Sequence, residues 1–159
     1  MNWITKFLKP KITSLFKKKS AAFDQVLWTT CECKNLIYKE DLQKNFNCCP
    51  KCGAHHKLSC VERFKIFFDN KEYKIIDTPL PKDDPINFVD TKKYTDRLKS
   101  ARKTTKQDDA VAIATGKVEN IQITVGAQDF RFIGGSFGAA SGEAFIHGVQ
   151  HAIDNKTPF

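Results

Sequence analysis

Residues 29–53 read TTCECKNLIYKEDLQKNFNCCPKCG, and this stretch holds five of the six cysteines of the chain. Its second half contains Cys49-Pro50-Lys51-Cys52-Gly53, a C-x₂-C pair in which two thiolates can hold one ion. Its first half contains Cys31-Glu32-Cys33, and fifteen residues lie between Cys33 and Cys49. Two cysteine pairs at this separation are typical of zinc sites, although the first pair is one residue shorter than the usual form. The stretch therefore predicts a zinc ribbon.

The preferred ligand set has four thiolates, because structural zinc takes four tetrahedral ligands. The set is Cys31, Cys33, Cys49 and Cys52. Mixed sets are the alternative, with Cys48, His55 or His56 as a substitute ligand. Outside the set, we expect Cys48 and Cys60 to be buried small hydrophobes and the two histidines to be exposed. Four protein ligands leave no position for water or substrate, so we expect a structural zinc ion that folds a lobe too small to fold alone.

Composition places the chain among globular proteins, with 159 residues, 41% hydrophobic and 28% charged. No run approaches the roughly 20 apolar residues that span a bilayer, and no secretory signal is recognisable. We therefore expect a soluble protein of a reducing compartment, the cytoplasm, in which clustered cysteines favour metal over disulfides.

The formal net charge of +8 is concentrated at the start of the chain, where residues 1–20 contain six lysines and no acid. This basic arm also carries Trp3, Ile4, Phe7 and Leu8 on one side of a predicted helix that Pro10 interrupts. We interpret the arm as a docking helix. A zinc ribbon with a basic arm also permits a second hypothesis, a nucleic-acid-binding module.

Four zones are predicted along the chain: a basic arm at 1–25, the ribbon at 26–58, a helical linker region at 59–107, and strands leading into a helix at 108–159. In the third zone, Ser59 and Glu62 form a capping box before a helix with apolar residues at 60, 64, 67 and 68. A strand is predicted over 73–76, and Tyr94, Leu98 and Ala101 mark a surface helix with a narrow apolar stripe.

In the last zone, period-two patterns predict strands around 111–113, 121–125 and 130–132, with a hairpin turn at Glu119-Asn120. A helix follows, with Phe145, Val149, Ala152 and Ile153 on one side, and it ends near Asn155. The turn Gly134-Gly135-Ser136 precedes this helix. It is interpreted either as a tight turn that ends in a Ser136 helix cap, or as a contact for substrate. The overall expectation is a mixed α/β (α+β) protein.

Several runs together resemble one family, the β subunit of the bacterial acetyl-CoA carboxylase carboxyltransferase. The runs are Asn2-Trp3-Ile4, Trp28-Thr29-Thr30-Cys31, Leu36-Ile37-Tyr38, residues 49–56, residues 90–98 and residues 132–138. They follow the order of the family from end to end of the chain. Two departures stand out: the first knuckle is C-x-C where the family has C-x₂-C, and the chain stops before a glycine-rich turn of the family that reads roughly SGGARMQE.

The resemblance implies a zinc ribbon followed by the first ββα part of a crotonase-like spiral domain, beginning at residue 108 and incomplete. It implies transfer of a carboxyl group from carboxybiotin to acetyl-CoA, giving malonyl-CoA for fatty-acid synthesis within an ATP-dependent complex. The implied partners are an α subunit, a biotin carboxyl carrier protein and a biotin carboxylase, with two α and two β subunits. Because the missing turn holds the enolate oxygen, we expect this N-terminal fragment to be inactive alone. Gly134, Gly135 and Ser136 are candidate substrate contacts, and no catalytic residue is predicted.

Overall fold

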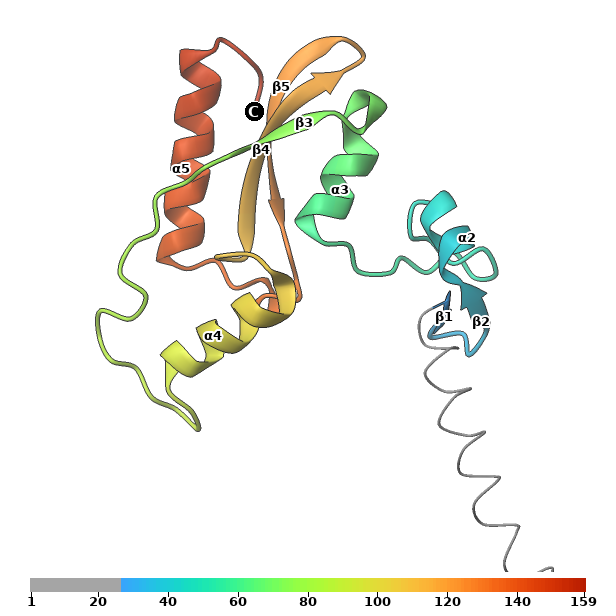
Figure 1. The fold of residues 1–159 in the computed structure, drawn as a ribbon, viewed down its shortest axis with the longest axis horizontal. Helices are drawn as coiled ribbons and strands as arrows, with labels where there is room; N and C mark the ends of the chain where they lie inside the picture. The colour runs from blue at the N-terminus through green and yellow to red at the C-terminus, as the bar shows by residue number, and fades with distance from the viewer. Residues whose placement is uncertain (1–26) are drawn as a thin grey trace, which may run out of the picture. The chain divides into compact units, whose positions relative to one another are not determined.

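A computed structural model describes residues 27–159, which form a mixed α/β fold with small sheets. The chain divides between His56 and Lys57 into two compact units, which Figure 1 colours blue and green to red. The predicted docking helix of the basic arm lies outside the described residues. None of the helices in residues 27–159 has the length and apolar character needed to cross a membrane.

The first unit is built on a short hairpin. Strand β1 (Trp28–Thr30) pairs antiparallel with β2 (Leu36–Tyr38), and helix α2 (Lys39–Lys44) follows directly. The rings of Trp28 and Tyr38, which face each other across the hairpin, have centroids 5.3 Å apart. The buried residues of this unit are Cys31, Ile37, Leu42 and Cys49. Half of this small core is cysteine, so apolar burial alone is a weak source of stability here.

The second unit contains a three-stranded antiparallel sheet in the order β3-β4-β5. Its elements are α3 (Cys60–Phe67), a 3₁₀ turn (Asp69–Lys71), β3 (Tyr73–Ile76), α4 (Tyr94–Thr105), β4 (Val111–Val118), β5 (Ile121–Gln128), a 3₁₀ turn (Ile133–Gly135) and α5 (Ala139–Asp154). Helices α3 and α5 cover opposite faces of the sheet (Figure 1). The predicted strand at 73–76 and the predicted hairpin at Glu119-Asn120 are confirmed, and both turn residues have positive φ.

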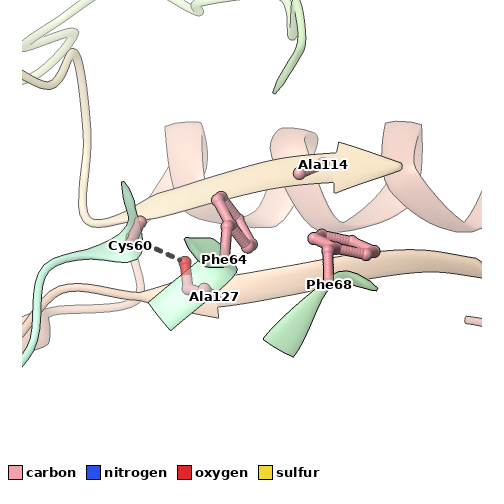
Figure 2. Close-up of a cluster of buried hydrophobic side chains, with 5 residues drawn as sticks. All are labelled: Cys60, Phe64, Phe68, Ala114 and Ala127. Atoms are coloured by element: carbon pink, nitrogen blue, oxygen red, sulfur yellow. Dashed lines mark hydrogen bonds between the residues drawn. The ribbon is translucent and has the colours of Figure 1, made fainter. Parts of the chain in front are cut away.

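Helix α3 begins at the predicted capping box. The Glu62 amide donates to Ser59 Oγ at 3.1 Å, and the Ser59 amide donates to Glu62 Oε2 at 2.8 Å. The helix then buries Phe64, and Phe68 just beyond it, against Ala114 and Ala127 of the sheet (Figure 2). The prediction for this face was right for Cys60, Phe64 and Phe68. It was wrong for Phe67, which is largely exposed because the helix ends there and the chain turns.

Helix α5 contacts the sheet through small residues. Its buried positions are Ser141, Ala144, Gly148 and Ala152. Of the predicted apolar side, Ala152 is buried and Val149 is half-buried, whereas the prediction was wrong for Phe145 and Ile153, which are exposed. The reason is the close approach of sheet and helix: a Cβ on Gly148 would lie 3.0 Å from Ile113 Cδ1. Only small side chains fit on that side of α5.

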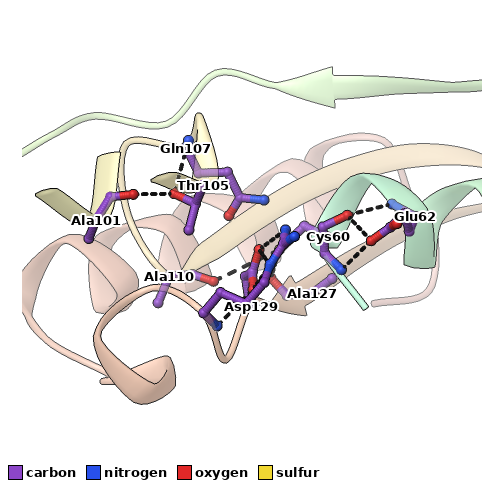
Figure 3. Close-up of polar contacts among 10 residues, drawn as sticks. Cys60, Glu62, Ala101, Thr105, Gln107, Ala110, Ala127 and Asp129 are labelled. Carbon is purple, nitrogen blue, oxygen red and sulfur yellow. Dashed lines mark hydrogen bonds and ion pairs between the residues drawn. The ribbon is translucent and has the colours of Figure 1, made fainter. Parts of the chain in front are cut away.

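Helix α4 and the turn after β5 form a third buried cluster: Leu98, Ala101, Ala110 and Phe132. The predicted α4 helix and its narrow stripe are confirmed. The predicted strand at 130–132 is wrong, because the chain turns at Asp129 and the Phe132 amide donates to the Asp129 carbonyl at 3.1 Å. Asp129 is fully buried, and its amide donates to the Ala110 carbonyl at 2.7 Å (Figure 3).

Candidate metal centre

Four cysteine sulfurs converge at one point in the first unit. The Sγ atoms of Cys31, Cys33, Cys49 and Cys52 all lie within 4.8 Å of one another. Cys31 Sγ is 3.6 Å from Cys52 Sγ, and Cys33 Sγ is 3.8 Å from Cys49 Sγ. A tetrahedron with zinc–sulfur bonds of about 2.3 Å has edges of about 3.8 Å, whereas a disulfide is about 2.05 Å long. The spacing therefore fits four thiolates around one ion.

The first knuckle closes even though it is one residue short. The Cys31 amide donates to the Asn35 carbonyl at 3.0 Å, and the Lys34 amide donates to the Cys31 carbonyl at 2.9 Å. The tight turn places Lys34 in the left-handed region, with φ of 63°. The same turn links β1 to β2, and the Cys31 and Cys33 sulfurs that it carries converge with those of the second knuckle. The C-x-C spacing is thus accommodated by backbone conformation.

The second knuckle has the longer loop. The Gly53 amide donates to the Cys49 carbonyl at 2.9 Å, and the Cys49 amide donates to the Ala54 carbonyl at 2.8 Å. Gly53 has φ of 75°, a conformation that glycine adopts at little cost. The Lys51 amide points at Cys49 Sγ, 3.4 Å away. A backbone amide of the second knuckle thus donates to one of the four sulfurs.

The four thiols differ in acidity. The side-chain amide of Asn35, which donates to Cys33 Sγ at 3.3 Å, lowers the pKa of the Cys33 thiol to about 6. The Ala54 backbone lowers the pKa of Cys52, but the sulfurs of Cys33 and Cys49 outweigh it and raise that pKa to about 12. Four thiolates at this distance repel one another, so a cation is needed to keep them all ionised. The donor set and its spacing suit zinc.

The alternative ligands lie outside the four-sulfur cluster. Cys48 Sγ contacts the Phe46 carbonyl at 3.8 Å and is half-buried, not fully buried as predicted. His55 is exposed, as predicted, whereas His56 is half-buried, and its Nε2 has no hydrogen-bond partner among the described residues. Cys60 is buried in the second unit, where it donates to the Ala127 carbonyl at 3.1 Å. Burial raises the pKa of the Cys60 thiol.

The predicted substrate contacts Gly134, Gly135 and Ser136 lie in the second unit, in the 3₁₀ turn and just after it. Gly134 and Gly135 have φ of 68° and 76°. The Gly135 amide donates to the Phe132 carbonyl at 2.8 Å, and the Ser136 amide donates to the Ile133 carbonyl at 3.2 Å. Two of the three amides are therefore used within the turn. The alternative role of Ser136 as a helix cap is wrong, because α5 has Gly138 at its N-cap.

Ser136 lines a cavity of about 350 Å³ in the second unit. Other lining residues are Tyr94, Leu98, Arg102, Asp109 and Ala140. Arg102 forms an ion pair with Asp83 at 2.6 Å, and Ser141 Oγ donates to Asp109. Burial, and then the charge of Asp109, raise the pKa of Tyr94. Sequence reasoning missed this cavity, because its walls come from four separate stretches, within 81–88, within 94–102, at 109 and within 132–140, that no local pattern connects.

The chain is similar to known proteins along nearly its whole length. Residues 28–52 match the family model of the acetyl-CoA carboxylase zinc finger domain. Three similar proteins are each called acetyl-coenzyme A carboxylase carboxyl transferase subunit beta. The protein of Pelagibacter ubique is 45% identical over 100% of this chain and 52% of its own length. Those of Gluconacetobacter diazotrophicus and Chelativorans sp. are 40% and 38% identical over 99% of this chain and 52% and 51% of their own lengths. The chain thus spans about half the length of the curated relatives it matches.

Proposed function

Because this chain belongs to the family of acetyl-CoA carboxylase carboxyltransferase β subunits, we propose that it serves the carboxyl transfer step of that enzyme. In this reaction the N–carboxyl bond of carboxybiotin breaks and biotin regains a proton. The methyl group of acetyl-CoA loses a proton, and its carbon forms the new bond that gives malonyl-CoA. The observation that carries the proposal is the similarity to the relatives, which extends over both units at 38–45% identity.

The proposed partners are an α subunit, a biotin carboxyl carrier protein and a biotin carboxylase, in an assembly with two α and two β subunits. The proposed setting is the cytoplasm, where malonyl-CoA enters fatty-acid synthesis and ATP drives biotin carboxylation. The names of the relatives support membership of an acetyl-CoA carboxylase. The nucleic-acid alternative rested on the lysines of residues 1–20, and no observation favours it.

We propose that Cys31, Cys33, Cys49 and Cys52 hold one structural zinc ion. The sulfur spacing and the match of residues 28–52 to a zinc finger family support this. Four protein sulfurs fill a tetrahedral site, so the ion has no position left for water or substrate. When bound, zinc supplies folding energy to a unit with little apolar core. The residues of the knuckles bring the four sulfurs together around one point.

We propose that residues 108–159 open a crotonase-like domain and that Ser136 lies near bound substrate. The cavity that Ser136 lines supports this role, because its walls are largely apolar and carry a few polar groups. The amides of Gly135 and Ser136 already bond carbonyls of the turn, so the turn would place Ser136 at the cavity wall instead of holding an oxyanion. We assign no catalytic residue within residues 27–159.

A chimera tests the proposed function. Residues 1–159 would replace the matching half of the Pelagibacter ubique protein, and the purified chimera would be mixed with the α subunit of that organism, carboxybiotin and acetyl-CoA. We expect malonyl-CoA to form, as it does with the complete relative as positive control. We expect none from residues 1–159 alone with the same α subunit. A folded, zinc-loaded chimera that binds the α subunit but forms no malonyl-CoA would contradict the proposal.

A further inference from the structure

Among the described residues, Asn35 is the side chain whose amide donates to a sulfur of the four-cysteine cluster. Its Nδ2 lies 3.3 Å from Cys33 Sγ and 3.4 Å from the Cys33 carbonyl oxygen. The first distance is normal for an N–H group that donates to sulfur, whereas the second is long for N–H to oxygen. The sulfur is therefore the principal acceptor of this amide.

The two knuckles differ in the donors that reach their sulfurs. In the longer knuckle, two residues separate the cysteines, and one of them, Lys51, donates its backbone amide to Cys49 Sγ. In the shorter knuckle, the Cys33 backbone amide hydrogen-bonds Cys31 Sγ, and the Lys34 amide donates to the Cys31 carbonyl. Backbone amides therefore reach sulfur in both knuckles, and Cys33 Sγ accepts in addition the side-chain amide of Asn35.

Asn35 is well placed to hold this geometry. Its own carbonyl accepts the Cys31 amide at 3.0 Å, and the next residue, Leu36, pairs with Thr30 in the hairpin. The backbone of Asn35 is therefore fixed relative to both cysteines of the knuckle. A short side chain on a fixed backbone position loses little conformational freedom when it bonds the sulfur.

We propose that Asn35 is a positioning residue of the metal centre, whose side-chain amide orients the Cys33 sulfur toward the ion. Groups that hydrogen-bond metal ligands commonly change metal affinity by about 10–100-fold. The inference rests on the proposed zinc site. It goes beyond that site because Asn35 is not a ligand.

The chain offers a matched control in Asn45. Its Nδ2 donates to the Cys48 carbonyl at 2.8 Å, so it makes a side-chain bond within the same unit but touches none of the four sulfurs. Zinc affinity of the 159-residue chain would be measured by competition with a chromophoric chelator. We expect Asn35→Ala to weaken zinc binding about tenfold or more and Asn45→Ala to change it less than about twofold. Equal effects of the two substitutions would overturn the proposal.

Cobalt provides a second readout, because the absorption of Co²⁺ reports the geometry of its thiolate ligands. Asn35→Asp, which keeps the shape but loses the donor, should shift the thiolate-to-cobalt band. Asn35→Gln, which keeps an amide donor, should have a band closer to the wild-type position. If Asn35→Ala does not fold, failure of Asn35→Gln to recover metal binding would contradict the proposal. Wild-type protein without metal would instead refute the zinc site itself, so the two failures are distinguishable.

Discussion

Cys49 anchors the second knuckle through its backbone and its sulfur. Its amide and carbonyl bond Ala54 and Gly53, and its sulfur accepts the Lys51 amide. We expect Cys49→Ser to lose the metal and unfold the first unit, because three thiolates and a hydroxyl bind zinc much more weakly than four thiolates. Metal content by elemental analysis and amide NMR spectra would measure both effects.

The neighbouring Cys48→Ser is the control for this substitution. Cys48 lies outside the four-sulfur cluster, so its replacement should leave one zinc ion per chain and an unchanged spectrum. Loss of zinc from Cys48→Ser, or retention of zinc by Cys49→Ser, would show that the ligand set has been assigned wrongly.

Asp129 is a fully buried carboxylate of the second unit. Burial raises its pKa, but the Arg131 guanidinium and backbone amide, which donate to it at 2.7 and 2.9 Å, outweigh burial and lower that pKa below its usual value. A lowered pKa in the folded state means that this interaction stabilises the fold above pH about 4 and is lost as the pH falls through the folded pKa.

We therefore expect Asp129→Asn to reduce the free energy of unfolding of the second unit by about 1–3 kcal/mol at pH 7. The difference from wild type should shrink as the pH is lowered below about 4, because wild type then protonates Asp129 too. Urea unfolding between pH 2.5 and 7 measures this. The exposed Asp154→Asn serves as control, and a difference for Asp129→Asn that stays constant with pH would contradict the assignment.

At the scale of elements, Gly116 of β4 lies close to Phe68, the residue that follows α3, and to Glu72, the residue that precedes β3. A Cβ there would lie 2.7 Å from the Phe68 ring and 2.8 Å from the Glu72 carbonyl oxygen. Gly116→Ala should destabilise the second unit by about 1–3 kcal/mol, because backbone and a packed ring must both shift. Thermal unfolding with near-UV circular dichroism would follow the change.

Gly142 of α5 provides the opposite case for comparison. The nearest atom to a Cβ at this position is on Phe137, 3.9 Å away, so an alanine fits without strain. Gly142→Ala should stabilise the unit by about 0.5–1 kcal/mol, because glycine is less favourable than alanine in the interior of a helix. If Gly116→Ala and Gly142→Ala changed stability in the same direction, the packing of Phe68 and Glu72 against Gly116 would be wrong.

Elements with a local chemical signature could be predicted from the sequence. The capping box at Ser59 located α3, and alternation located β4 and β5. Elements decided by distant contacts could not be predicted. Alternation at Phe130 and Phe132 looked like a strand, but buried Asp129 bonds Arg131 and turns the chain there.

Helix α5 shows a further limit of periodicity. The helix carries apolar residues on more than one side, and periodicity alone predicts that the side with the large residues is buried. The sheet selects the side with small residues, because the backbone of Gly148 must pass close to Ile113. The same limit applied to the sites: the spacing of cysteines predicted the metal cluster, whereas the cavity beside Ser136 depends on the packing of separate segments.

At the scale of the whole molecule, each compact unit has its own core. The core of the first unit consists of Cys31, Ile37, Leu42 and Cys49, and the buried clusters of the second unit contain none of these. Removing the metal should therefore unfold the first unit and leave the sheet of the second unit intact. Amide NMR spectra of the full chain, recorded before and after a zinc chelator is added, would test this. Loss of the β4 and β5 signals together with those of the ribbon would argue against it.

X-ray absorption of the reduced, zinc-loaded chain most directly tests whether a closed cage of four thiolates organises the first unit. One zinc ion per chain, with four sulfur neighbours at about 2.3 Å and no nitrogen or oxygen neighbour, is the predicted result. Fewer than four sulfurs, a bound histidine or water, or a pure protein that retains no metal would contradict the account.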